Sequence, residues 1–166
     1  MIIMKRLFSL FVALNLCLHV VAQPTVGSLR VNRMSEPQGV ADSRPMMSWI
    51  VESTERGVSQ SAYEIEVYDG QRKVWDTGKV LSDCSTGVEY AGEALRSGTR
   101  YVWQVRVWDN KGKVSKWSAR AGWLSGMLTE NEWQAKWIEP QMQTTESPML
   151  RREFSLSKPI ASAVAY

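Results

Sequence analysis

The chain has 166 residues and a formal net charge of +3 at pH 7, from 20 Lys and Arg against 17 Asp and Glu. The charges of both signs are interspersed, without the basic stripe that marks a nucleic-acid binder, so that class of protein is excluded. The length is sufficient for one complete domain with its own core and part of a second domain.

The first 22 residues have the pattern of a cleaved signal peptide. Lys5 and Arg6 precede an apolar run that ends at Val21, followed by a cleavage point after residue 22. A membrane anchor is the alternative, but the run contains Asn15 and His19 and is shorter than the roughly 20 apolar residues that cross a bilayer. We therefore expect an exported protein, either periplasmic or extracellular.

Removal of this segment limits the chemistry of the exported chain. A lipid anchor through Cys17 is a further alternative, which the bulky Leu16 before it disfavours. Cleavage removes Cys17 and His19, the single histidine, so no internal disulfide and no imidazole remain. Serine triads, cysteine–histidine pairs and most zinc sites are thereby excluded. The remaining Cys84 is expected to be a small, buried strand residue.

Short strands separated by turn residues are predicted between residues 23 and 126. The expected strands cover 28–32, 46–51, 62–68, 74–77, 86–90 and 101–108, with a last strand that includes Trp123. About seven strands at turn spacings of roughly 8 to 12 residues are typical of an immunoglobulin or fibronectin type III-like antiparallel β-sandwich. The sequence therefore predicts an all-β protein.

The most informative stretch is 95–118. Alternation predicts that four apolar side chains of its strand are buried: Tyr101, Trp103, Val105 and Val107. Tyr101 is a candidate for a tyrosine corner, in which the hydroxyl bonds to upstream backbone. Residues 109–112 are of types that adopt positive φ at low cost, so they predict a turn that closes a hairpin.

The composition changes after residue 126. Residues 127–147 are predicted to be a linker, in which Trp133 and Trp137 fix the chain against a neighbouring domain. Residues 148–166 are predicted to hold two strands, over 150–156 and 160–166. Since the chain stops inside the second strand, whose backbone groups need partners, we expect a fragment of a longer protein.

Seven segments form an ordered set: Pro45-x-x-Ser48-Trp49, Gln60-Ser61-Ala62-Tyr63-Glu64-Ile65, Trp75-x-x-Gly78-Lys79-Val80, 95–108, Lys116-Trp117-Ser118, Trp133-x-Ala135-x-Trp137-Ile138 and Pro148-x-Leu150-Arg151-Arg152-Glu153-Phe154. This set resembles the N-terminal region of secreted bacterial α-L-rhamnosidases, over nearly all of the mature chain. The tryptophan pair followed by the last segment is its most specific part.

The resemblance implies that a fibronectin type III-like domain at 23–126 precedes a jelly-roll-like β domain, of which 148–166 are the first strands. It also implies that a helical (α/α)6 barrel further along carries catalysis, by an inverting mechanism with two carboxyl groups. No position in this chain matches the catalytic motif. The expected function is a non-catalytic accessory segment of the enzyme, inactive alone, which braces the downstream β and barrel domains. Contact with rhamnose-containing polysaccharide is a further expectation.

A stand-alone fibronectin-like binding or adhesion module is the alternative function. Such a binder should end in a closed sandwich near Leu124 followed by a polar tail. Because the residues from Trp133 onward instead begin a new apolar region, the accessory segment is favoured.

No catalytic, cofactor-binding or metal-binding residue is predicted, and no acids cluster as in a calcium loop. Two pairs of carboxylates share strand faces, Glu64 with Glu66 and Glu130 with Glu132. Since nothing near them suggests a desolvating pocket, both pairs are expected to be solvated.

Tryptophan is the residue type that offers a binding site, because an exposed indole can stack on a sugar ring. Of the eight tryptophans, Trp49 and Trp103 are expected to face the core. Trp108, Trp75 and Arg106 are the candidates for a carbohydrate or inter-domain contact. Stacking of Arg106 on Trp108 is the structural alternative, worth roughly 0.5 to 1 kcal/mol at an exposed site.

Overall fold

The computed structural model describes residues 23–136, 138–139, 149–160 and 163. The predicted signal segment, 1–22, and Trp137 lie outside these residues. In the described part of the chain, no helix is long and apolar enough to cross a membrane.

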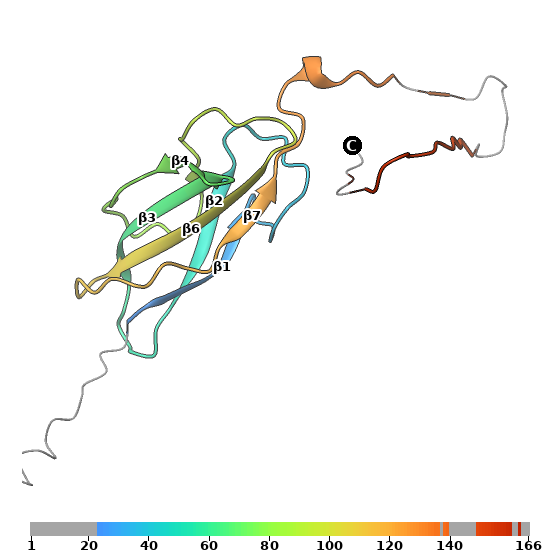
Figure 1. Ribbon diagram of the computed structural model, residues 1–166. Coiled ribbons are helices and arrows are strands. Elements are labelled where there is room, and N and C mark those ends of the chain that lie inside the picture. The colour runs from blue at the N-terminus through green and yellow to red at the C-terminus, as the bar shows by residue number, and fades with distance from the viewer. Residues whose placement is uncertain (1–22, 137, 140–148, 161–162, 164–166) are drawn as a thin grey trace, which may run out of the picture.

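Seven strands in the described residues form two antiparallel sheets that pack face to face (Figure 1). The three-stranded sheet has the order β1 (Thr25–Val31), β2 (Met46–Glu52) and β5 (Val88–Glu89). The four-stranded sheet has the order β4 (Arg72–Asp76), β3 (Gln60–Asp69), β6 (Arg100–Asp109) and β7 (Ala121–Leu124). The predicted immunoglobulin-like β-sandwich is confirmed.

The β5 strand is shorter than the 86–90 expected from the sequence. It pairs with β2 through Met46 with Glu89 and Met47 with Val88, and Tyr90 N–H then donates to Pro45 O at 3.0 Å. Gly87, which precedes the strand, has a φ of +70°, outside the extended region that pairing requires. The positive φ of this glycine therefore sets where β5 begins.

Alternate side chains of β6 form the centre of the core, as predicted. Trp103, Val105 and Val107 have no exposed surface, and Tyr101 is 2% exposed. They pack against Trp49 of β2, which is likewise buried. Complete burial of a large apolar side chain contributes roughly 1.5 to 3 kcal/mol, so this strand supplies a large share of the apolar stabilisation.

The predicted tyrosine corner is confirmed. The hydroxyl of Tyr101 accepts a hydrogen bond from the backbone N–H of Arg96 at 2.8 Å. Its ring stacks on Trp123 of β7, with 5.1 Å between the ring centroids. Tyr101 thus ties the loop before β6 to both β6 and β7.

The turn after β6 is built by a side chain as well as by backbone. The carboxylate of Asp109 accepts hydrogen bonds from the N–H groups of Lys111 (2.9 Å) and Lys113 (2.8 Å). Of residues 109–112, Gly112 alone takes a positive φ, of +80°. The predicted turn is present, closed by an aspartate that mimics a backbone acceptor.

Residues 114–118 return along β6 through two serines spaced three apart. Ser115 N–H donates to Val107 O, and the Ser115 hydroxyl accepts from Val107 N–H at 3.0 Å. Ser118 repeats this pattern with Val105, its hydroxyl accepting at 3.1 Å. The two hydroxyls satisfy β6 donors that a regular strand would pair, so the segment follows β6 without being a strand.

The chain leaves the sandwich at a hydrogen-bonded corner. The fully buried Ser125 donates its hydroxyl proton to Arg96 O at 2.6 Å, and Gly126 N–H donates to Val40 O at 2.7 Å. A Cβ at Gly126 would lie 2.8 Å from Gly39 O, so the two backbones approach as closely as glycine permits.

The next residues, 127–132, which we call the exit segment, remain attached to the sandwich. Leu128 N–H donates to the hydroxyl of Ser97 at 2.9 Å. Ser97 in turn donates to the carboxylate of Glu132, the last residue of the 3₁₀ helix Glu130–Glu132. The exit segment is therefore held to the loop that precedes β6.

Residues 149–160 contain no strand, although one was predicted over 150–156. Phe154 is 77% exposed and Leu156 is 59% exposed. An extended segment without a neighbouring strand leaves its backbone donors and acceptors to water, and its apolar side chains without cover. The assignment of 148–166 to a second β domain stays a prediction.

Replacement of Tyr101 by phenylalanine tests the corner. Because Tyr101→Phe leaves the Arg96 N–H without its acceptor, we expect the free energy of unfolding to fall by about 1 to 2 kcal/mol. Urea denaturation followed by tryptophan fluorescence measures this. Tyr63→Phe is the matched control, since the Tyr63 hydroxyl has no hydrogen bond within the described residues. Equal effects of the two variants would contradict the assignment.

Candidate functional site

The outward side chains of β3 and β6 form a continuous surface, which we call the outer face. Cross-strand register places Glu64 beside Arg106, Glu66 beside Gln104 and Tyr68 beside Val102, with Trp108 opposite Ala62 at one end. All the β6 members of this row are half-buried. The outer face is therefore a packed layer of polar and aromatic groups.

Arg106 lies at the centre of one half of the outer face. Its guanidinium forms two hydrogen-bonding contacts with Glu64, at 2.8 Å and 2.7 Å. The same group lies 5.2 Å from the ring of Trp108 and 4.7 Å from that of Trp117. The predicted stacking of Arg106 on Trp108 is confirmed, and it also involves Trp117, which brings the return segment 114–118 onto this face.

Glu66 is the centre of the other half. Its carboxylate accepts hydrogen bonds from Lys73 Nζ (2.5 Å), the Tyr68 hydroxyl (2.7 Å) and Gln104 Nε2 (2.7 Å). Lys73 also donates to Asp76 at 2.7 Å. Burial alone would raise the pKa of Glu66, but the three donors and the charge of Lys73 outweigh burial and lower it.

The expectation that Glu64 and Glu66 are solvated is wrong. Their side chains are only 13% and 12% exposed, because Arg106 and Lys73 lie over them. Both carboxylates are ion-paired, and the lowered pKa of Glu66 keeps that group in the charged form. In the second pair, Glu130 and Glu132 are both exposed, as expected, and Glu132 also accepts a hydrogen bond from Thr129 N–H.

Two further cations lie on aromatic rings of the outer face. Lys79 Nζ is 4.7 Å from the ring centroid of Trp108, and the guanidinium of Arg120 is 5.0 Å from that of Tyr68. Sequence reasoning missed Lys79, Arg120 and Trp117. The period-two signal is restricted to strand residues, and all three of these side chains belong to connecting segments.

The structure does not bring Trp75 together with Trp108 and Arg106. Trp75 packs against the core and meets Tyr90 edge to face, with 5.1 Å between the ring centroids. Burial raises the pKa of Tyr90 to about 12. Trp75 thus belongs to the border of the core, whereas Trp108 and Arg106 belong to the outer face.

The prediction that Cys84 is a buried strand residue is wrong, because this residue is exposed. It lies in the connection before β5, where its backbone carbonyl accepts a hydrogen bond from Gln60 Nε2 at 2.8 Å. Among the described residues, no three His, Cys, Asp or Glu side chains gather in a way that could hold a metal ion.

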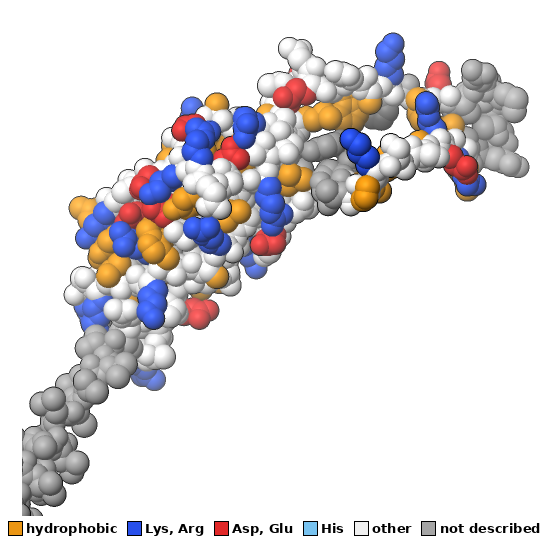
Figure 2. Space-filling model, in the orientation of Figure 1, with side chains coloured by type: hydrophobic (Ala, Val, Ile, Leu, Met, Phe, Trp, Pro, Cys, Tyr) orange, Lys and Arg blue, Asp and Glu red, His pale blue; other side chains and the backbone are white. Residues whose placement is uncertain are grey.

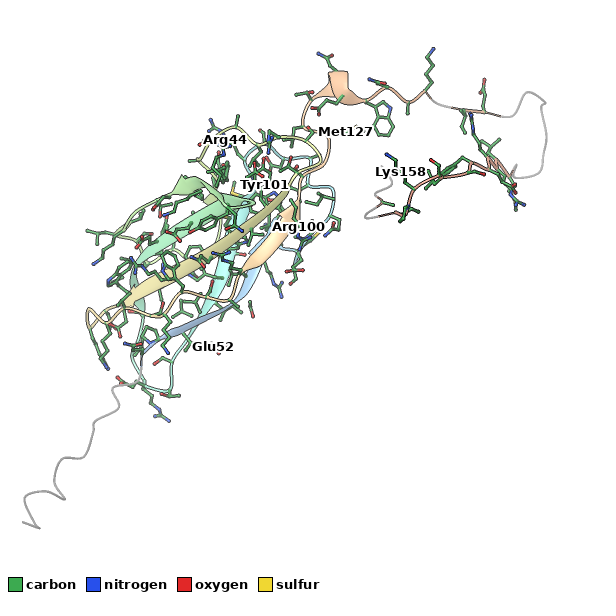
Figure 3. All side chains as sticks on the ribbon, viewed as in Figure 1. Arg44, Glu52, Arg100, Tyr101, Met127 and Lys158 are labelled. Atoms are coloured by element: carbon green, nitrogen blue, oxygen red, sulfur yellow. The ribbon has the colours of Figure 1, made fainter. Side chains whose placement is uncertain are left out.

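A hollow of about 410 Å³ lies beside the corner where the chain leaves the sandwich. Its lining includes Arg44, residues 90–95 and, from the exit segment, Leu128 and Thr129. Figure 3 shows Arg44, Tyr101 and Met127 at this end of the molecule and Glu52 toward the opposite end. The exit segment thus forms part of the surface of the sandwich at this end.

Comparison with known families identifies the sandwich. Residues 26–129 match the family described as "Rha78A-like, N-terminal immunoglobulin domain". An α-L-rhamnosidase of Streptomyces avermitilis is 42% identical over 130 residues, which cover 75% of this chain and 13% of that protein. An α-L-rhamnosidase of Formosa agariphila is 37% identical over 136 residues, covering 77% of this chain and 14% of that protein.

A solved structure shows the same similarity. The crystal structure of the Streptomyces avermitilis α-L-rhamnosidase complexed with L-rhamnose superimposes with a TM-score of 0.66 at 41% sequence identity. The match covers 70% of this chain and 12% of that one. The chain therefore spans about one seventh of the length of the relatives it matches.

The acid sensitivity of the outer face can be tested at Glu66. Because its pKa is lowered in the folded protein, its contribution to stability is complete above the ordinary carboxyl pKa of 4.5 and is lost as the pH falls through the lower folded value. Glu66→Gln should therefore flatten the decline in the free energy of unfolding below pH 4.5, measured by urea denaturation at successive pH values. Glu139→Gln, at an exposed position, is the control and should keep the wild-type slope. A Glu66→Gln curve parallel to wild type would contradict the assignment.

Proposed function

The chain belongs to the family of Rha78A-like N-terminal immunoglobulin domains, and we propose that it serves as the non-catalytic accessory module of a larger α-L-rhamnosidase. The observation that carries the proposal is the match to relatives bearing that name, of which this chain covers only 13% and 14%. The catalytic residues of such an enzyme would then lie in the larger part of the parent protein that this chain does not cover.

The structure supports a bracing role for this module. The two acidic side chains of its outer face, Glu64 and Glu66, are covered by Arg106 and Lys73, so they are not open to a substrate as the acid and base of glycoside hydrolysis would be. Its exit segment, by contrast, is hydrogen-bonded to the sandwich through Ser97 and Glu132. A module joined to its neighbour by such a segment restricts the orientation of that neighbour.

The partners that follow from this role are the downstream β and barrel domains of the parent enzyme. The exposed apolar side chains Met149, Leu150 and Phe154 support a second domain, because apolar groups gathered in one short segment mark a surface that packs against another element. Contact with rhamnose-containing polysaccharide is the finer part of the proposal. Export to the periplasm or the cell exterior is supported by the sequence of residues 1–22.

The relatives favour this role over the stand-alone binding or adhesion module. Both relatives described above are named as enzymes, and in both the matched region is a small share of the protein. A binder that functions alone would not need the exit segment to be fixed.

A chimera tests the bracing role. The matched segment of the Streptomyces avermitilis enzyme is deleted in one variant and replaced by the aligned residues of this chain in another. We expect the deletion to lower the Tm of the enzyme by several degrees and this chain to restore it, measured by differential scanning calorimetry. An unrelated fibronectin type III sandwich of equal length is the control. Restoration by the unrelated domain, or none by this chain, would overturn the proposal.

The chain on its own should be inactive. Purified residues 23–166 are expected to release no p-nitrophenol from p-nitrophenyl α-L-rhamnoside, because no position in the sequence matches the catalytic motif and the two acids of the outer face are already ion-paired. Absorbance of the released nitrophenolate measures this. Turnover that stays constant through successive purification steps would show that the module has its own catalytic site.

A further inference from the structure

The start of β1 limits where an exported form of this chain can begin. Pro24 is fully buried, and Thr25 forms the first pair of β1 with Glu52 of β2. Cleavage after Pro24 or within β1 would remove a buried side chain or a paired strand residue, and its contribution to the fold would be lost. The sandwich therefore requires the chain from residue 24 onward, and Gln23 is the last residue before the folded part.

The residues before β1 indicate the same point. The apolar run of the leader ends in Val20-Val21-Ala22, and a leader peptidase cleaves after a small residue such as Ala22. Cleavage one residue later would follow the large side chain of Gln23, which does not fit that pattern. The leader pattern and the burial of Pro24 therefore both favour Gln23 as the amino-terminal residue of the exported chain.

The side chain of Gln23 is available to react with the amino group of the same residue. Gln23 is exposed, and among the residues that the structure describes its amide has no hydrogen-bond partner. In an amino-terminal glutamine, the α-nitrogen and the side-chain carbon Cδ are the two ends of one short chain of atoms. A bond between them closes an unstrained five-membered ring, and the reaction is favoured because both groups belong to one residue.

The start of β1 is remote from the point where the chain leaves the sandwich. Glu52, the partner of Thr25, lies toward the end of the molecule opposite Met127 (Figure 3), and β1 begins at that end (Figure 1). Figure 2 shows Lys, Arg, Asp and Glu atoms on the surface there, as expected of an end that faces water. Gln23 therefore remains accessible when a downstream domain follows the exit segment.

From these observations we infer that Gln23 becomes the amino-terminal residue on export and closes to a pyroglutamyl lactam. This inference rests on the proposed function, which includes export. The α-nitrogen attacks Cδ of the side-chain amide, so that the N–Cδ bond forms and the Cδ–Nε2 bond breaks. One proton of the α-amine passes to Nε2, which leaves as ammonia. Nothing is oxidised or reduced, and no second reactant is needed.

The lactam changes the chemistry of the chain end without changing the fold. It converts the α-amine into a neutral amide, which removes the terminal positive charge. The peptide bond between Gln23 and Pro24 is retained, so the burial of Pro24 and the pairing of β1 are undisturbed. An aminopeptidase requires a free α-amine. The lactam therefore protects β1, an edge strand that would otherwise begin one residue from a free chain end.

Mass spectrometry of the exported chain provides the test. Residues 1–166 are produced in an exporting bacterial host, and the purified protein is kept for several weeks at about pH 8, where much of an α-amine is deprotonated. Trypsin then releases the peptide 23–30, which contains no lysine, so an amine-specific reagent reports only its α-amine. We expect this peptide to be lighter than the linear sequence by one ammonia molecule and to remain unlabelled.

Gln23→Asn is the matched control. It keeps a polar amide after the cleavage point, but its side chain is one methylene shorter, so the same attack would form a strained four-membered ring. Its peptide should keep the ammonia and be fully labelled. A linear, labelled Gln23 peptide or the same mass loss in Gln23→Asn would overturn the lactam. Retention of residues 1–22, or a start at another residue such as a lipid-modified Cys17, would overturn the cleavage point and with it the inference. The chimera experiment is independent of these outcomes, because it measures the Tm of the enzyme.

Discussion

Burial of alternate β6 side chains between the two sheets is the interaction on which the rest of this structure depends. Trp103, Val105 and Val107 are completely enclosed, and the inward row that they form fixes which side chains of β6 must point outward. The register with β3 then determines that Arg106 meets Glu64 and that Gln104 meets Glu66. A shift of one residue would place the charged row in the core and expose the apolar one, so the core specifies the surface as well as the stability.

The outward row has a different organisation from a simple solvated surface. Arg106 and Lys73 form ion pairs with the carboxylates of Glu64 and Glu66. Lys79 and Arg120 instead lie on aromatic rings, which carry no net charge. The same sheet therefore combines an apolar interior, a neutralised middle and charged points at intervals.

Local patterns were sufficient to predict much of the fold. Period-two alternation identified β3 and β6, and the position of Tyr101 at the start of β6 identified the corner, because both signals lie within a few consecutive residues. The burial of Glu64 and Glu66 was not predictable in this way. Arg106, which covers Glu64, lies 42 positions further along the chain, and Lys73, which covers Glu66, belongs to a strand whose register shifts beside Val67. The ring contacts of Lys79 and Arg120, and the exposure of Cys84, likewise depend on how connecting segments lie across strands.

The close approach of Gly126 to Gly39 has a mechanical consequence. Tension applied along the polypeptide beyond Thr129 reaches the Gly126 N–H to Val40 O and Val40 N–H to Leu124 O bonds together with the Ser125 contacts. The C-terminal edge of the sandwich should therefore resist fraying when the polypeptide beyond it is pulled, because several hydrogen bonds must break before this edge detaches.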